Sequence, residues 1–195
     1  MSVFTYDPSA MKNWATTTLN YISGGTESVA NISAEFSEQM TKLASPNVWT
    51  GAAASQNYQN FVDTQNALVR FVNSFANCFE ESMSAINSSL QQLETTNLGS
   101  STNIMSAYAG VTFNQISEST PATIATETVV YDYATISDIA SELQKIELSL
   151  ENVETKINTE INKLDNTSEN IFNGDLAASI KSNLSNTLTS NMKLV

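Results

Sequence analysis

Apolar residues recur at intervals of three, four or seven positions along most of this chain, which places them on one face of an α-helix. The first such stripe runs from Met11 to Leu43, the second from Tyr58 to Leu93 and the third from Ile136 to Leu164. Only six glycines and three prolines occur among 195 residues, so long stretches contain no helix breaker. We therefore predict an all-α protein.

The first two stripes are joined by a short turn. Asp7 and Pro8 suit a helix start, because Asp accepts hydrogen bonds from free backbone amides and Pro is tolerated in the first turn. Pro46 ends this helix, which Gly24 and Gly25 should kink or bring close to another helix. The second helix, of roughly 40 residues, would be about 60 Å long. Two long helices with a short connection predict an antiparallel hairpin.

The sequence divides into three parts. Residues 1–95 form the first predicted hairpin, and residues 96–134 read as a linker or insertion in which the β-branched stretch before Tyr133 could form one or two short strands. Residues 135–195 form a second hairpin, whose last helix begins near Asp175. We expect the two hairpins to pack as an elongated four-helix bundle.

An aromatic-x-Gly sequence stands at the turn of each predicted hairpin. A shift of 121 residues superimposes the first and third stripes, and a shift of 123 carries Trp49 and Gly51 onto Phe172 and Gly174. Glycine permits the backbone geometry needed between helices, and the aromatic ring can be buried against both helices at the tip. The sequence therefore predicts a tandem repeat with these four residues at the hairpin turns.

The Trp-x-Gly turn between two amphipathic helices resembles the WxG family of small secreted proteins of type VII (ESX) secretion systems. Residues 1–95 match this pattern well, and 135–195 match a degenerate FxG version. The resemblance implies a helical hairpin that pairs antiparallel with a second hairpin, either in another protein, in a second copy or within the chain. It also implies export by a membrane ATPase, with Trp49, Gly51, Phe172 and Gly174 as the turn or export motif. The protein would be secreted or displayed at the cell surface.

Two features depart from the family pattern. No Tyr is followed four positions later by Asp or Glu, which is the export signal of many family pairs. The chain is also about twice the usual family length, as a fused pair of hairpins would be. The start, MSVFTYDPSAMKNW, lacks the basic and apolar regions of a Sec signal peptide, and we expect none.

Composition argues against several classes of function. The chain has no histidine and one cysteine, Cys78, so Ser-His-Asp catalysis, Cys-His catalysis and an intramolecular disulfide are impossible. We predict no enzymatic activity, cofactor or metal site. A net charge of −12 repels phosphate, which argues against nucleic acid and anionic membranes as partners. No apolar run reaches about 18 residues, so we expect no stable membrane insertion.

The expected function is a non-enzymatic type VII substrate or partner that acts by helix–helix binding. Because the last helix is short, we expect the distal part of the second stripe either to be covered by the 96–134 insertion or to stay exposed. If exposed, it is a candidate partner surface, namely Phe79, Met83, Ile86, Leu90 and Leu93. The alternatives are the N-terminal targeting domain of a larger secreted effector, a cytosolic helical scaffold or phage structural protein, and a helical pore-forming toxin.

Overall fold

The computed structural model describes residues 5–98, 115–169 and 171–192 of the chain. Its elements in chain order are β1 (Thr5–Tyr6), α1 (Pro8–Leu19), the π-helical turn η1 (Asn20–Gly24), α2 (Val29–Leu43), α3 (Ala52–Leu98), α4 (Tyr133–Lys163), β2 (Phe172–Asn173) and α5 (Asp175–Met192).

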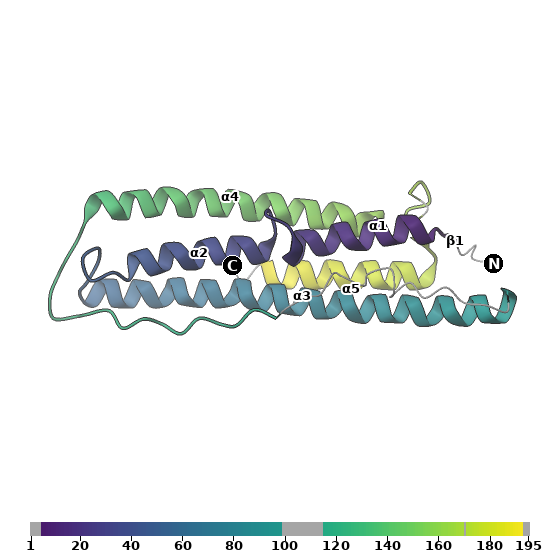
Figure 1. Cartoon of the computed structure of the whole chain (residues 1–195), viewed down its shortest axis with the longest axis horizontal. Coiled ribbons are helices and arrows are strands. Elements are labelled where there is room, and N and C mark those ends of the chain that lie inside the picture. The colour runs from purple at the N-terminus through teal and green to yellow at the C-terminus, as the bar shows by residue number, and fades with distance from the viewer. Residues whose placement is uncertain (1–4, 99–114, 170, 193–195) are drawn as a thin grey trace.

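The helices form an elongated four-helix bundle, which confirms the predicted fold class (Figure 1). The first hairpin consists of α1 and α2, which follow one another along one line, and the long helix α3. The second consists of α4 and the shorter α5. In the bundle α2 packs on α3 and α4, and α5 packs on α3 and α4. The two hairpins are antiparallel, because the turn between α2 and α3 lies at one end of the bundle and the turn between α4 and α5 at the other.

The first helix breaks where the two glycines predicted a kink. The π-helical turn ends at Gly24, Gly25 is extended, and Ser28 caps α2 by accepting a hydrogen bond from the amide of Asn31. A Cβ on Gly25 would lie 2.9 Å from the carbonyl oxygen of Asn20. Only glycine therefore allows this backbone approach without rearrangement.

A large core runs the length of the bundle and includes side chains from α1 to α5. Trp14 of α1 joins the two hairpins within it. Its ring centroid lies 5.4 Å from that of Phe79 on α3, and its indole N–H donates a 2.7 Å hydrogen bond to the carbonyl oxygen of Glu160 on α4. Glu160 lies in the last turn of α4, where carbonyl groups lack partners within the helix. Trp14 thus satisfies a helix end of the other hairpin.

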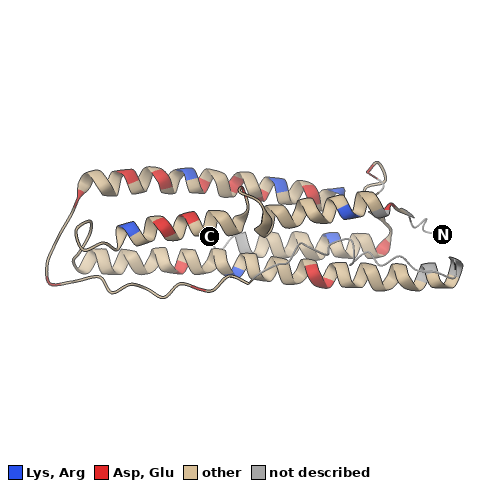
Figure 2. Cartoon of the chain, in the orientation of Figure 1, with Lys and Arg blue, Asp and Glu red and all other residues tan. Residues whose placement is uncertain are grey.

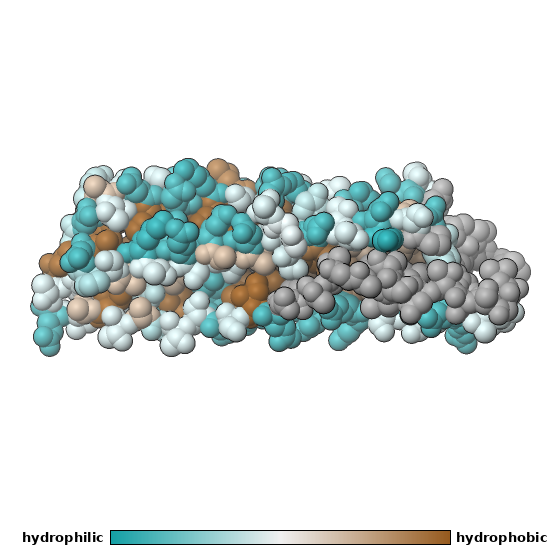
Figure 3. Space-filling view, viewed as in Figure 1, coloured by the Kyte–Doolittle hydropathy of each residue, from teal (hydrophilic) through white to brown (hydrophobic). Residues whose placement is uncertain are grey.

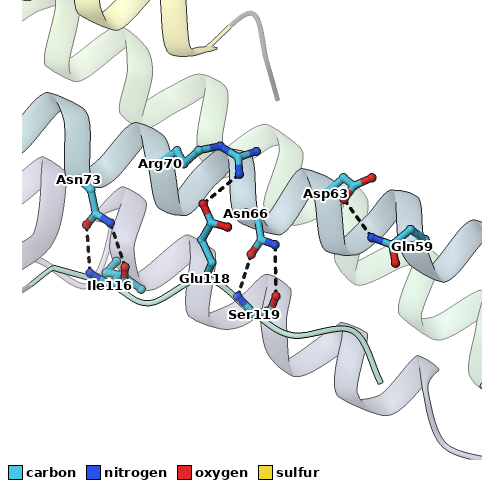
Figure 4. Close-up of polar contacts among 8 residues, drawn as sticks. All are labelled: Gln59, Asp63, Asn66, Arg70, Asn73, Ile116, Glu118 and Ser119. Atoms are coloured by element: carbon cyan, nitrogen blue, oxygen red, sulfur yellow. Dashed lines mark hydrogen bonds and ion pairs between the residues drawn. The ribbon is translucent and has the colours of Figure 1, made fainter. Parts of the chain in front are cut away.

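Residues 115–132, which we call the connecting segment, lie extended along α3 and lead into α4 (Figure 1). Asn66 and Asn73 of α3 each bind the segment with both ends of the side-chain amide, to Ser119 and Ile116 respectively (Figure 4). The seven helical residues from Asn66 to Asn73 rise about 10.5 Å, and the three extended residues from Ile116 to Ser119 span about 10 Å. The two pairs of binding residues are therefore equally spaced. Arg70 adds a 2.9 Å ion pair to Glu118.

The predicted short strands in the connecting segment are wrong. The described part of the segment forms one isolated bridge, between Tyr131 and Trp49, and no regular strand. The β-branched residues before Tyr133 instead bond the turn of the first hairpin, as described below. The sequence reasoning missed the pair of two-residue strands β1 and β2, whose register aligns Thr5 with Asn173 and Tyr6 with Phe172.

Candidate interaction surfaces

The two hairpin turns have matching backbone geometry. Gly51 precedes α3 with φ +110°, and Gly174 precedes α5 with φ +116°. This region is open to glycine but strained for residues with a Cβ. A Cβ on Gly51 would also lie 3.3 Å from a methyl carbon of Val129 in the connecting segment. The glycines of both aromatic-x-Gly sequences are therefore required by the turn itself.

An extended segment crosses each turn in the same way. At the first turn, the amide of Asp132 donates to the carbonyl of Val48 at 2.9 Å. At the second, the amide of Asp7 donates to the carbonyl of Ile171 at 3.2 Å. Asp132 then caps α4 and Asp7 caps α1, each through its carboxylate.

The bonded residues extend the internal repeat beyond the helices. Tyr6-Asp7 and Tyr131-Asp132 precede the first helix of each hairpin, and each Tyr pairs with the aromatic residue of the opposite turn. The interval from Asp7 to Val29 is four residues longer than the matching interval from Asp132 to Leu150. The longer interval contains the break at residues 20–28. The two hairpins are therefore structurally equivalent at their starts and turns.

The two aromatic residues of the turns differ in exposure. Phe172 is fully buried, whereas Trp49 is half-buried and lines a surface hollow with Leu43 and Phe61. Trp49 therefore presents part of its ring to solvent, but Phe172 presents none. Of the two turns, only the first offers its aromatic side chain to a partner without rearrangement.

The expected partner surface on the distal half of α3 is wrong. Phe79, Met83, Ile86 and Leu90 are at most 2% exposed. The side chain of Leu93 lies outside the described residues. Trp14 of α1 packs on Phe79, so α1 covers part of this stripe.

The antiparallel pairing of the hairpins explains the error. It places the second turn beside the far end of α3, so α5 starts there and runs back along it (Figure 1). Cys78 of α3 contacts Thr187 near the end of α5 through a 3.5 Å hydrogen bond from the hydroxyl to sulfur. The described part of α5 does leave part of α3 uncovered, but it is the half nearest the turn that contains Trp49.

A groove lies between α3 and α4 in that uncovered half. It consists of two adjoining hollows of about 370 and 190 Å³ that share Leu143. We call it the open groove. Its half-buried apolar lining comes from the first turn, α3 and α4, namely Trp49, Phe61, Ile136, Leu143 and Leu150. Leu68 and Ile146 form part of its base and are buried.

Glutamates border the open groove on the α4 side. Glu147, Glu151 and Glu154 line it, and none forms an ion pair with a Lys or Arg of the described chain. Elsewhere on α4, Glu142 pairs with Lys145 and Glu160 with Lys163. Figure 2 shows acidic residues along α4, and Figure 3 shows a mainly hydrophilic face with apolar side chains visible between the helices.

Among the described residues, no group of three or more Cys, Asp or Glu side chains could hold a metal ion, and no helix is long and apolar enough to cross a membrane. The Thr135 hydroxyl holds the pKa of Asp132 below its usual value at the helix cap. The hydrogen bond that the Lys156 ammonium donates to the Glu27 carboxylate raises the pKa of Lys156. Both pKa shifts come from contacts that hold the fold together. The ion pair between Glu27 and Lys156 joins the break after α1 to α4.

A recurring dipeptide in the sequence indicates how the two hairpin turns are covered, although the helical pattern alone does not. The dipeptide Tyr-Asp directly precedes the first helix of both halves, at Tyr6-Asp7 and Tyr131-Asp132. Its recurrence could have predicted that equivalent segments cross the two turns. The role of Trp14 carried no such signal, because its partner Glu160 is 146 residues away. Comparisons of the chain with protein-family models, curated proteins and solved structures found no match.

Proposed function

We propose that this chain is a non-enzymatic, helix-binding protein exported by a type VII secretion system, with Trp49 as the exposed part of its recognition element. The observation that carries the proposal is the pair of equivalent aromatic-x-Gly turns at opposite ends of two antiparallel hairpins. This is the arrangement that the resemblance to the WxG family implies for a paired substrate. Here both hairpins belong to one chain.

The exposure of the two turns favours the first as the recognition element. A receptor can contact the half-buried ring of Trp49 on the folded bundle, whereas access to Phe172 would require unfolding of the second turn. The connecting segment also fixes the first turn: the Gly51 amide donates to Ala125 at 2.7 Å and the Thr50 amide to Val130 at 3.1 Å. A turn held in one conformation loses little entropy when it binds.

The test is export from the bacterial host. The tagged chain is expressed with and without the secretion ATPase, and cell and medium fractions are blotted. We expect the protein in the medium only when the ATPase is present. The Trp49→Ala variant should remain inside the cell. A matched control is Tyr21→Ala, which also removes a half-buried aromatic ring but at the break in the first helix. It should be exported like the parent chain.

Each contrary result has a distinct meaning. Retention of the parent chain in the presence of the ATPase would overturn the proposal of export. Export of Trp49→Ala at the parent level would remove Trp49 from recognition. Retention of both variants would point to a loss of folding, which far-UV circular dichroism of the purified proteins would reveal.

A further inference from the structure

The open groove lies in line with α5, along the same face of α3. Thr64 lines the groove, and Cys78, two heptads further along α3, contacts α5 through Thr187. Residues separated by two heptads lie on the same face of a helix. Figure 1 shows that α5 runs beside only one half of α3. The groove is therefore the unfilled half of a position that a helix occupies elsewhere in the same bundle.

The length of the open groove suits a helix. Its lining on α4 extends from Ile136 to Glu154, which corresponds to about 27 Å of helix. An occupying helix of about 18 residues would span this distance. Its apolar stripe would contact the half-buried side chains of Phe61, Leu143 and Leu150.

The charge around the open groove specifies the occupant's polar residues. The carboxylates of Glu147, Glu151 and Glu154, which form no ion pair with a described Lys or Arg, border it on α4. The groove lining includes no Lys or Arg. On the opposite side, the polar lining residues from α3 are uncharged, namely Asn57 and Thr64. A second copy of this chain fits poorly, because its own net charge is −12.

We propose that the open groove binds an amphipathic partner helix of about 18 residues that carries Lys or Arg beside its apolar stripe. The proposal rests on the proposed function as a helix-binding protein and names the chemistry of its partner. The partner helix completes the fourth position of the bundle from the end of α5 to the Trp49 turn. Its basic residues lie against the glutamates of α4.

The test uses the purified full chain and two synthetic, labelled peptides of about 18 residues. Both carry Leu at helical intervals of three and four, and they differ in having Lys or Glu beside the Leu stripe. We expect the Lys peptide to bind by fluorescence anisotropy and to shift the emission of Trp49, whose ring lines one end of the groove. The Glu peptide should not bind measurably.

Charge reversal distinguishes the groove from general attraction to an acidic protein. Glu151→Lys should weaken binding of the Lys peptide about two- to fivefold at low salt, and should improve binding of the Glu peptide. The matched control is Asp138→Lys, which makes the same charge change on an exposed part of α4 outside the groove lining. It should leave the affinity for the Lys peptide unchanged.

Three results would overturn the proposal. The first is that the Lys peptide does not bind to the folded chain. The second is an equal effect of Glu151→Lys and Asp138→Lys, which would mean attraction to the net charge alone. The third is a concentration-dependent dimer, measured by sedimentation, that dissociates on Leu150→Ser, because a second copy would then occupy the groove. The export assay measures whether secretion from cells requires Trp49, so its result is independent of these binding outcomes.

Discussion

The two tryptophans of this chain allow the same substitution to be tested in two environments. Trp14 is 2% exposed, and its indole N–H bonds the Glu160 carbonyl at the end of α4. Trp49 is half-buried, and its indole has no hydrogen bond to the described residues. We expect Trp14→Phe to destabilise the bundle strongly and Trp49→Phe to have a small effect.

The expected magnitudes follow from what each substitution removes. At Trp14 the change leaves a buried carbonyl without its partner, which costs about 1–3 kcal/mol. The smaller ring also loses buried apolar area, worth roughly 1 kcal/mol. The free energy of unfolding should therefore fall by about 2–4 kcal/mol. At Trp49 no hydrogen bond is lost and the ring is already partly solvated, so the fall should be below about 1 kcal/mol.

Urea unfolding followed by far-UV circular dichroism measures both effects, because helix content does not depend on tryptophan emission. The slope of the unfolding free energy against urea should be equal in all three proteins, which shows that the same surface is exposed on unfolding. Equal costs for the two substitutions, or a cost below about 1 kcal/mol at Trp14, would refute a role for the indole in joining the hairpins.

The same structure makes three further predictions. Gly51→Ala should lower the free energy of unfolding by about 1–2 kcal/mol in urea titrations, because φ is +110° at this turn; an unchanged midpoint would argue against strain. Asn73→Ala should speed hydrogen exchange of the connecting segment several-fold, because two hydrogen bonds to it are lost. Gln59→Ala, which breaks only a contact within α3, should not change that exchange. The Thr135 hydroxyl lowers the pKa of Asp132, so the stability from this cap should be full above the ordinary carboxyl pKa and lost as pH falls through the lowered value. The stability difference between the parent chain and Asp132→Ala should shrink in acid, and a difference that grew in acid would contradict this sign.

The helices and turns could be predicted from the sequence because their causes are local. The apolar spacing from Ile136 to Leu164 alone places a long helix, and α4 covers Tyr133–Lys163. The break at Gly24 and Gly25, and the glycine requirement at Gly51, likewise depend on residues close in sequence. Periodicity and breaker residues record these local preferences directly.

The location of the exposed apolar surface could not be predicted, because it depends on how the two hairpins dock. The apolar stripe of α3 reads alike at Leu68 and at Ile86. Only the docking of the hairpins decides that Ile86 lies in the closed core while the open groove reaches Leu68. The same limit applies to Trp14, whose bond to the Glu160 carbonyl joins residues far apart in sequence. Tertiary packing decides which part of an apolar stripe is covered, and the spacing of the stripe does not indicate this.

The unequal lengths of the two hairpins connect the fold with the proposed activity. Both begin with a Tyr-Asp pair and turn at an aromatic-x-Gly, but α5 has 18 residues where α3 has 47. No described residue of α5 lines the open groove, where Phe61, Leu143 and Leu150 are half-buried. Exposed apolar surface costs about 25 cal/mol for each Å², and a contiguous groove of it typically marks a binding site. The apolar base and acidic border of the open groove favour a basic amphipathic helix as its partner. Binding of such a helix would bury the exposed apolar side chains of the groove and so stabilise the bundle.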